Sequence, residues 1–144
     1  MKEKNSMTLT FTSQAVNESF ARMAVAAFIM PLDPTVSEIT DIKTAVSEAV
    51  TNAIIHGYEG TSGDITLLCT VDGRDIYIEI SDRGKGIEDI KKAMTPLYTS
   101  RPELERSGLG FTVMEAFMDS LKVESVPGSG TTVRMSKKLA SDER

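Results

Sequence analysis

Cysteine and histidine are nearly missing from this sequence, and each scarcity narrows its chemistry. The 144 residues include one cysteine, Cys69, and one histidine, His56. A lone cysteine cannot form an intramolecular disulfide, so we expect a reducing, cytoplasmic environment and a thiol that packs in a core strand instead of acting as a nucleophile. A lone histidine lacks companion ligands, so we interpret His56 as a structural residue at a helix end and not as a metal ligand or phosphoacceptor.

Basic residues and long apolar runs are also in short supply. Lysine and arginine total 16 against 21 aspartates and glutamates, which gives a formal net charge of -5. This balance argues against nucleic acid or an anionic membrane as the main partner, since both attract clustered basic side chains. The beginning, MKEKNSM, has no apolar signal-peptide core, and no later run is long enough to cross a bilayer. We expect a soluble protein that forms one domain over residues 1–144.

The most informative stretch is DIKTAVSEAVTNAIIHG, residues 41–57. Its apolar residues recur at helical spacing, which predicts a helix with one buried face, and Gly57 is typical of a helix end. Glu48 and Asn52 interrupt the apolar pattern. Because they lie four residues apart, a helix stacks the carboxylate beside the carboxamide. Such a pair can hold a divalent cation and a proton.

The remaining patterns predict a domain in which helices and strands are segregated along the chain. We expect Asn17 to cap the helix at 17–30 and Thr35 or Ser37 to cap the central helix. Charged, proline-containing residues 88–107 have little periodicity, and we interpret them as a lid over a site. This order favours an α+β two-layer sandwich. The expected elements are strands at 7–12, 64–70, 75–81, 123–126 and 131–135, helices at 17–30 and 108–121, and a frayed polar tail at 136–144.

Two pairs of closely spaced glycines suggest a ligand that contacts the backbone. Asp82-x-Gly84-x-Gly86 follows a predicted strand, so a flat ring could approach the backbone while the carboxylate accepts a hydrogen bond from an amine. Ser107-Gly108-Leu109-Gly110 opens a predicted helix, where free N–H groups favour phosphate. Each pattern alone also fits an ordinary turn. Together with Glu48 and Asn52 they indicate a nucleotide site, although neither a P-loop nor a dinucleotide-binding turn is present.

These motifs resemble those of the GHKL ATPase and kinase superfamily along the entire chain. Glu48-x-x-x-Asn52 with His56 and Gly57 is similar to its N box, and the two glycine motifs are similar to its G1 and G2 boxes. Gly130-Thr131-Thr132 is similar to its closing threonine motif. The resemblance implies a GHKL (Bergerat) type sandwich, with a mixed, mostly antiparallel sheet and helices on one face, that binds ATP or ADP with Mg²⁺.

Site roles follow from this resemblance at the matching positions. It implies that Glu48 is the catalytic general base, that Asn52 ligates Mg²⁺ and that Asp82 pairs with the adenine amine. Gly86 would lie near the base, residues 108–110 near the phosphates, and Thr132 in the adenine-side network. The full set of implied nucleotide contacts is Asn52, Asp82, Gly84, Gly86, Arg106, Ser107, Gly108, Leu109, Gly110 and Thr132.

Within the superfamily, three runs resemble the sporulation anti-sigma factors that restrain sigma factor F. They are NESFAR (17–22), VSEAVTNAIIHGY (46–58) and PELERSGLGFTVME (102–115). The resemblance implies a serine kinase for an anti-anti-sigma factor, partner contacts at Arg22, Glu105 and Arg106, and a homodimer. Lys85 and Arg101 are left without an assigned role.

Two functions of different classes remain open at this point. One is a Mg-ATP-dependent protein serine kinase that also inhibits a sigma factor. The other is a nucleotide-gated module that sequesters a sigma factor, of the sporulation or the stress type, without catalysis. A hydrolytic ATPase of the gyrase or MutL kind is disfavoured, because the sequence has no room for the transducer domain of such machines.

Overall fold

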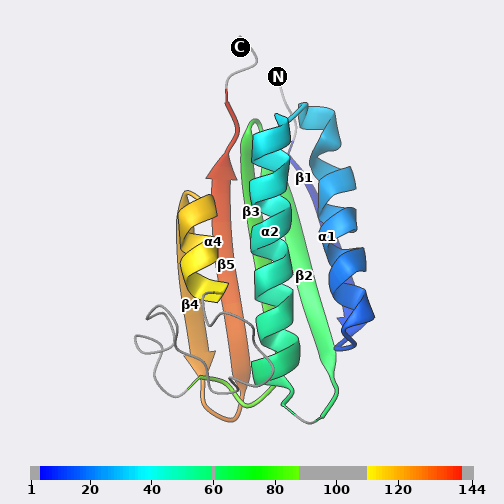
Figure 1. The fold of residues 1–144 in the computed structure, drawn as a ribbon, viewed down its shortest axis with the longest axis vertical. Coiled ribbons are helices and arrows are strands. Elements are labelled where there is room, and N and C mark those ends of the chain that lie inside the picture. The colour runs from blue at the N-terminus through cyan, green and yellow to red at the C-terminus, as the bar shows by residue number, and fades with distance from the viewer. Residues whose placement is uncertain (1–3, 60, 88–109, 141–144) are drawn as a thin grey trace.

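A computed structural model describes residues 4–59, 61–87 and 110–140 of the chain. It shows a sheet with helices covering one of its faces (Figure 1). All four strand pairings are antiparallel, so the described sheet is antiparallel throughout rather than mixed. The predicted α+β two-layer sandwich is confirmed. The strands are β1 (Asn5–Thr12), β2 (Asp64–Asp72), β3 (Asp75–Asp82), β4 (Ser120–Val126) and β5 (Gly130–Lys138), in the spatial order β1-β2-β3-β5-β4.

The helical layer is organised around its longest helix, α2. This helix runs from Val36 to Asn52 and continues as one π-helical segment, η2 (Ala53–Gly57). Helix α1 (Val16–Ile29) and helix α4 (Gly110–Phe117) pack against α2, one on each side (Figure 1). The predicted helix end at Gly57 is confirmed. A short 3-10 segment, η1 (Met30–Leu32), leads from α1 toward α2.

The core lies between α2 and the central strands. Alternate residues of β2 and β3, including Leu67 and Ile78, are buried under apolar residues of α2 such as Val46 and Val50. Each fully buried side chain of this size contributes about 1.5–3 kcal/mol. Cys69 belongs to this core, and burial raises the pKa of its thiol to about 12. The prediction that this cysteine packs in a core strand is therefore confirmed.

The face of the sheet that the described helices leave uncovered is mainly polar. Arg134 of β5 lies there and bonds Glu79 on β3, with Nε to Oε1 at 2.7 Å, and also Glu124 on β4. Because side chains alternate along a strand, the register decides which residues share this face. Thr132, two residues before Arg134, therefore points to the same polar face.

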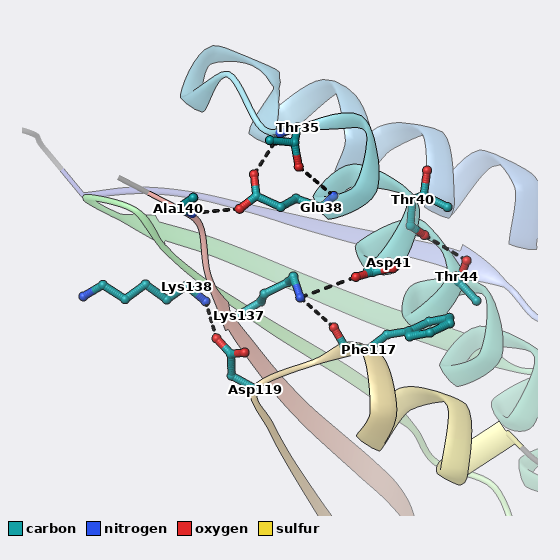
Figure 2. A network of polar contacts seen from close by, with 10 residues as sticks. All are labelled: Thr35, Glu38, Thr40, Asp41, Thr44, Phe117, Asp119, Lys137, Lys138 and Ala140. Carbon is teal, nitrogen blue, oxygen red and sulfur yellow. Dashed lines mark hydrogen bonds and ion pairs between the residues drawn. The ribbon is translucent and has the colours of Figure 1, made fainter. Parts of the chain in front are cut away.

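The beginning of α2 carries a complete capping box (Figure 2). The Thr35 side chain accepts the Glu38 N–H at 3.0 Å, and the Thr35 N–H donates to the Glu38 carboxylate at 2.8 Å. Of the two caps considered, the structure selects Thr35. Such a cap stabilises a helix by about 1 kcal/mol.

The last described residues are not the frayed tail that their polar composition suggests. Residues 136–138 complete β5, and Leu139 is only 2% exposed. The Ala140 N–H donates to the second Glu38 oxygen at 2.7 Å, while Lys137 Nζ donates to the Phe117 carbonyl at 2.8 Å and pairs with Asp41 at 3.7 Å (Figure 2). For residues 136–140 the prediction is wrong, because backbone pairing with β3 and contacts to α2 order this segment, whatever the polarity of its side chains. Residues 141–144 lie outside the description.

Two helix boundaries also differ from the prediction. Helix α1 begins at Val16 without a side-chain cap, and the Asn17 amide instead donates to the Thr12 carbonyl at 2.8 Å. Helix α4 ends at Phe117, so it does not extend to residue 121. The Asp119 N–H is already bonded to the Ser136 carbonyl at 2.8 Å, which commits the chain to the sheet.

The strands predicted at 64–70 and 75–81 form β2 and β3, which are joined by a tight turn because β2 ends at Asp72 and β3 begins at Asp75. Residues 88–107, which we interpret as a lid from their sequence, lie outside the described residues. Within the part of the chain that is described, no helix is both long and apolar enough to cross a membrane.

Candidate functional site

The first group of site residues, the helical cluster, consists of Glu48, Asn52 and Gly110. Glu48 and Asn52 lie on consecutive turns of α2, and α4 begins at Gly110 beside them. A Cβ atom built on Gly110 would lie 3.0 Å from Asn52 Nδ2 and 3.3 Å from Glu48 Oε2. The backbone of α4 therefore passes directly over the carboxylate and the carboxamide. A side chain at residue 110 would intrude on both groups.

The second group, the strand-end cluster, is centred on Asp82, the last residue of β3. Asp82 is only 9% exposed, and its Oδ1 accepts the Gly84 N–H at 2.8 Å. Burial raises the pKa of this carboxyl group, while hydrogen bonds from the Gly84 and Thr131 N–H groups act in the lowering direction. Carboxylate oxygens accept several hydrogen bonds each, so Asp82 retains capacity for a donor from a ligand. We define the strand-end cluster as Asp82, Gly84, Thr131 and Gly57.

Gly57 joins the strand-end cluster to the helix that carries the helical cluster. A Cβ atom on Gly57 would lie 2.8 Å from the Asp82 carboxyl, and one on Gly84 would lie 1.8 Å from the Gly57 carbonyl oxygen. Gly57 follows Asn52 by five residues within α2 and η2. The structure thus brings Asp82 to the end of the segment that carries Glu48 and Asn52. The sequence indicates Gly57 as a helix end, and only the packing reveals its contact with Asp82.

The loop after Asp82 is held through its backbone N–H groups. The Arg83 N–H donates to the Tyr58 hydroxyl at 2.8 Å, and the Lys85 N–H donates to the Gly57 carbonyl at 2.8 Å. The Ile87 N–H donates to Ser125 Oγ at 2.7 Å. These bonds fix the loop before any ligand arrives.

Two further residues of this loop, Lys85 and Gly86, contact neighbouring segments. Lys85, which had no assigned role, pairs with Glu59 just after η2. Gly86 packs against the end of β4, since a Cβ atom there would lie 2.5 Å from the Val126 carbonyl oxygen. Both residues therefore border the strand-end cluster without belonging to it.

The two threonines of β5 do not share a face of the sheet. Thr131 pairs with Asp82 in the register and is buried, and its hydroxyl lies 2.9 Å from Ser125 Oγ. Thr132 pairs with Ser81 and lies on the polar face described above. The register therefore places Thr131, and not the predicted Thr132, on the face of Asp82. The doubled threonine left this choice open, because a shift of one residue reverses the face.

Other predicted site residues are placed apart from these clusters or lie outside the described chain. Arg22 is on α1, across α2 from α4 (Figure 1), where it contacts Glu18 at 3.9 Å and Ser19 Oγ at 3.2 Å. His56 lies within η2. The predicted site residues that lie outside the description are Glu105, Arg106, Ser107, Gly108 and Leu109. Arg101, which has no assigned role, lies there too.

The donor atoms of the helical cluster suit a hard cation held together with a ligand. No group of three or more His, Cys, Asp or Glu side chains gathers as a metal site in the described ranges. Glu48 and Asn52 supply carboxylate and carboxamide oxygens beneath Gly110, which leaves room that a side chain would fill. Mg²⁺ prefers oxygen ligands and is commonly bound by few protein groups together with phosphate oxygens. The residues present therefore fit Mg²⁺ bound with a nucleotide.

Comparison with known proteins shows which family this chain belongs to. Residues 11–137 match the family model of the histidine kinase-like ATPase domain. A protein of Thermoanaerobacter sp. (strain X514) named anti-sigma F factor is 62% identical over 99% of this chain and its own full length. The chain belongs to the anti-sigma F factor family. Relatives with the same name in Clostridium novyi and Clostridium acetobutylicum are 62% and 60% identical, covering 96% and 95% of this chain and 98% and 96% of their own.

Solved structures support the fold of this anti-sigma F factor family member. A crystal structure of the RsbU and RsbW domains of a Mycobacterium tuberculosis protein matches 95% of the chain and 33% of its own, with a TM-score of 0.69 and 19% identity. The SiaB–SiaC complex of Pseudomonas aeruginosa matches 89% of the chain and 88% of its own, with a TM-score of 0.63 and 12% identity. As a member of an ATPase domain family, the protein is a nucleotide-binding, kinase-family protein.

Proposed function

We propose that this protein binds and inhibits sigma factor F and, with Mg-ATP, phosphorylates a serine of an anti-anti-sigma factor. The observation that carries the proposal is that one helical segment, α2 with η2, presents Glu48 and Asn52 under Gly110 and then places Gly57 against Asp82. A site of this form can hold a base at one end and a polyphosphate at the other. Relatives at 60–62% identity carry the anti-sigma F name over nearly the full chain.

At the phosphate end, Asn52 would ligate Mg²⁺ through its carboxamide oxygen. When bound, the ion neutralises charge on the phosphate oxygens and supplies the electrostatic part of phosphoryl transfer. Gly110 keeps the space above Asn52 open, because any side chain there would meet the carboxamide within 3.2 Å. The protein thus contributes position and an unobstructed approach.

Glu48 would act as the general base toward the substrate serine. The serine Oγ forms a bond to the γ-phosphorus, and the bond from that phosphorus to the β–γ bridging oxygen breaks. ADP leaves with the electron pair, while the hydroxyl proton passes to the Glu48 carboxylate. A positioned general base contributes about 10² to 10⁴ in rate.

At the base end, Asp82 would accept a hydrogen bond from the exocyclic amine of adenine. Its carboxyl is oriented by the Gly84 N–H and braced by the Thr131 backbone. We assign the adenine-side hydroxyl to Thr131, which shares the face of Asp82, and not to Thr132. The predicted partner contact at Arg22 and the predicted homodimer remain part of this proposal.

A phosphorylation experiment tests the proposal and its alternative together. The purified protein is incubated with γ-labelled ATP, Mg²⁺ and the anti-anti-sigma factor of the same organism, and phosphoserine is mapped by mass spectrometry. We expect label on one serine of the partner, and none when Mg²⁺ is chelated. ATP-dependent binding of sigma factor without any label would instead establish the nucleotide-gated module.

A further inference from the structure

One buried hydroxyl group next to the strand-end cluster has no part in the chemistry proposed above. Tyr58, the residue after η2, is 8% exposed. Its hydroxyl donates to the Asp64 carbonyl at 2.7 Å and accepts the Arg83 N–H at 2.8 Å. The hydroxyl thereby connects the beginning of β2 to the residue that directly follows β3.

The ring of Tyr58 has little freedom to move. A Cβ atom on Gly63 would lie 2.4 Å from its Cε1, so the ring packs closely against the backbone of Gly63, which leads into β2. The Tyr58 N–H bonds the Ala53 carbonyl at 3.1 Å and closes the π-helical turn. A π-helical turn at the end of a helix is often found at functional sites. The hydroxyl is therefore delivered to a fixed point.

The group that it holds is the peptide between Asp82 and Arg83. The Arg83 N–H of this peptide is bonded to Tyr58, and its other side, the Asp82 carbonyl, lies 2.1 Å from where a Gly130 Cβ would be. The peptide is thus enclosed between Tyr58 and β5. Because this peptide follows the Cα of Asp82 and precedes the Gly84 N–H, its plane sets the direction of the carboxyl and of the donor that orients it.

We propose that Tyr58 is a positioning residue for base recognition, whose hydroxyl sets the preference for a 6-aminopurine over a 6-oxopurine nucleotide. The inference rests on the proposed function, in which Asp82 accepts the exocyclic amine. A donor and acceptor pair discriminates strongly only when the protein group is held in place. A 6-oxo group presents an acceptor to the Asp82 carboxylate, and a loop that cannot turn cannot relieve that repulsion.

The effect of Tyr58 is confined to the base end of the site. Glu48 and Asn52 lie on α2 before η2 begins, and their positions come from helix packing with α4. Loss of the Tyr58 hydroxyl therefore changes nucleotide affinity and selectivity and leaves turnover at saturating ATP unaltered.

The test compares Tyr58→Phe with the wild type, using ATP and inosine triphosphate as probes and calorimetry to measure Kd. The variant keeps the ring and leaves the Arg83 N–H and the Asp64 carbonyl without their shared partner. We expect the Kd for ATP to rise about tenfold and the Kd for inosine triphosphate to stay within about twofold. The ratio of the inosine triphosphate Kd to the ATP Kd, which measures selectivity, therefore falls. Tyr77→Phe is the matched control, since Tyr77 is 49% exposed on the polar face.

The ratio of the two constants separates positioning from a merely structural role. A general loosening of the fold weakens both nucleotides alike, and an unchanged ratio overturns the inference. If Tyr58→Phe does not fold, Gly63→Ala provides the second variant, because its methyl displaces the ring while retaining the hydroxyl. It must lower the ratio in the same way. A wild type that binds neither nucleotide removes the proposed nucleotide site itself, whatever Tyr58 does. A wild type that binds both equally removes the proposed recognition of the exocyclic amine by Asp82, and the inference with it.

Discussion

Asp82 and Glu48 are carboxylates of the same proposed site, yet the chain holds them by different means. Asp82 ends a strand, and its carboxyl accepts hydrogen bonds from the backbone N–H groups of Gly84 and Thr131. The loop that follows Asp82 is itself held by hydrogen bonds from its backbone N–H groups. Glu48 projects from the middle of α2, where its position follows from helix packing and from the approach of Gly110. The strand-end cluster is fixed by hydrogen bonds between three elements, whereas the helical cluster rests on one helix and its neighbour.

This difference matches the two tasks of a phosphotransferase. Recognition of a base benefits from donors and acceptors that do not move, since rigidity makes a mismatched base costly. Phosphoryl transfer requires groups that an ion, a polyphosphate and a protein hydroxyl can reach. The following variants separate the two ends, beginning with the largest expected effect.

Glu48→Gln should disable the helical cluster alone. We expect the rate of phosphoryl transfer to fall by about 10² to 10⁴, because the substrate hydroxyl loses its proton acceptor. The Kd for ATP should stay near the wild-type value, since the strand-end cluster is intact. Single-turnover kinetics with labelled ATP and calorimetry measure the two quantities. Glu115→Gln, at an exposed position of α4, is the matched control, and retained transfer in Glu48→Gln would remove the general-base assignment.

Asp82→Asn should give the opposite pattern. Hydrogen bonds to a charged group contribute about 1.5–3 kcal/mol, so we expect ATP affinity to fall by roughly 10- to 100-fold. Turnover at saturating ATP should change much less, because Glu48 and Asn52 are untouched. Calorimetry measures the affinity for ATP, and the phosphorylation assay measures the turnover at saturating ATP. Equal losses in affinity and in saturated turnover would show that the two ends are not separable.

Thr131→Ala and Thr132→Ala sharpen the comparison within β5. Thr131 lies beside Asp82 and Ser125. Its hydroxyl is the proposed adenine-side group, so the alanine variant loses one neutral hydrogen bond of about 0.5–1.5 kcal/mol and should bind ATP a few-fold more weakly. Thr132 lies on the other face, and its alanine variant should bind like the wild type. The Kd for ATP of each variant is the measurement. The reverse order of effects would restore the original assignment of Thr132.

The smallest expected effect is on stability and depends on pH. Burial raises the pKa of Asp82, so the folded chain binds this proton more tightly than the unfolded chain. The resulting stabilisation is complete below the ordinary pKa of an aspartate and is lost as the pH rises through the raised value. Without nucleotide, Asp82→Asn should therefore be more stable than the wild type at neutral pH, and the difference should shrink toward pH 4. Urea unfolding across this range measures it, and a less stable variant at pH 7 would contradict the argument.

Local patterns in the sequence predicted most of the elements and the positions of several candidate site residues on them. The spacing of Glu48 and Asn52 placed both on one side of a helix, and Asp82 was found at the end of a strand. The Thr35 cap was one of two candidates considered. These predictions hold because helix periodicity, capping and strand ends depend on neighbours only a few residues away.

Features that depend on distant parts of the chain were missed. Residues 136–140 looked like a frayed tail, but β3 and Glu38 order them. Tyr58 carried no sequence signal of a role, because its two hydrogen-bond partners lie 6 and 25 residues away. The one local feature of Tyr58 is its place directly after Gly57, the glycine that ends the helix.

The sequence by itself determined which residues could carry the chemistry: a carboxylate and a carboxamide one helical turn apart, an aspartate before two glycines, and a threonine pair near the end. Only the tertiary structure decided which threonine faces Asp82, how η2 brings Gly57 against that carboxyl, and that Gly110 lies against Glu48 and Asn52 of α2. The physical reason is that residue type and spacing act locally, whereas strand register and the close approach of backbones are set by packing among segments far apart in the chain.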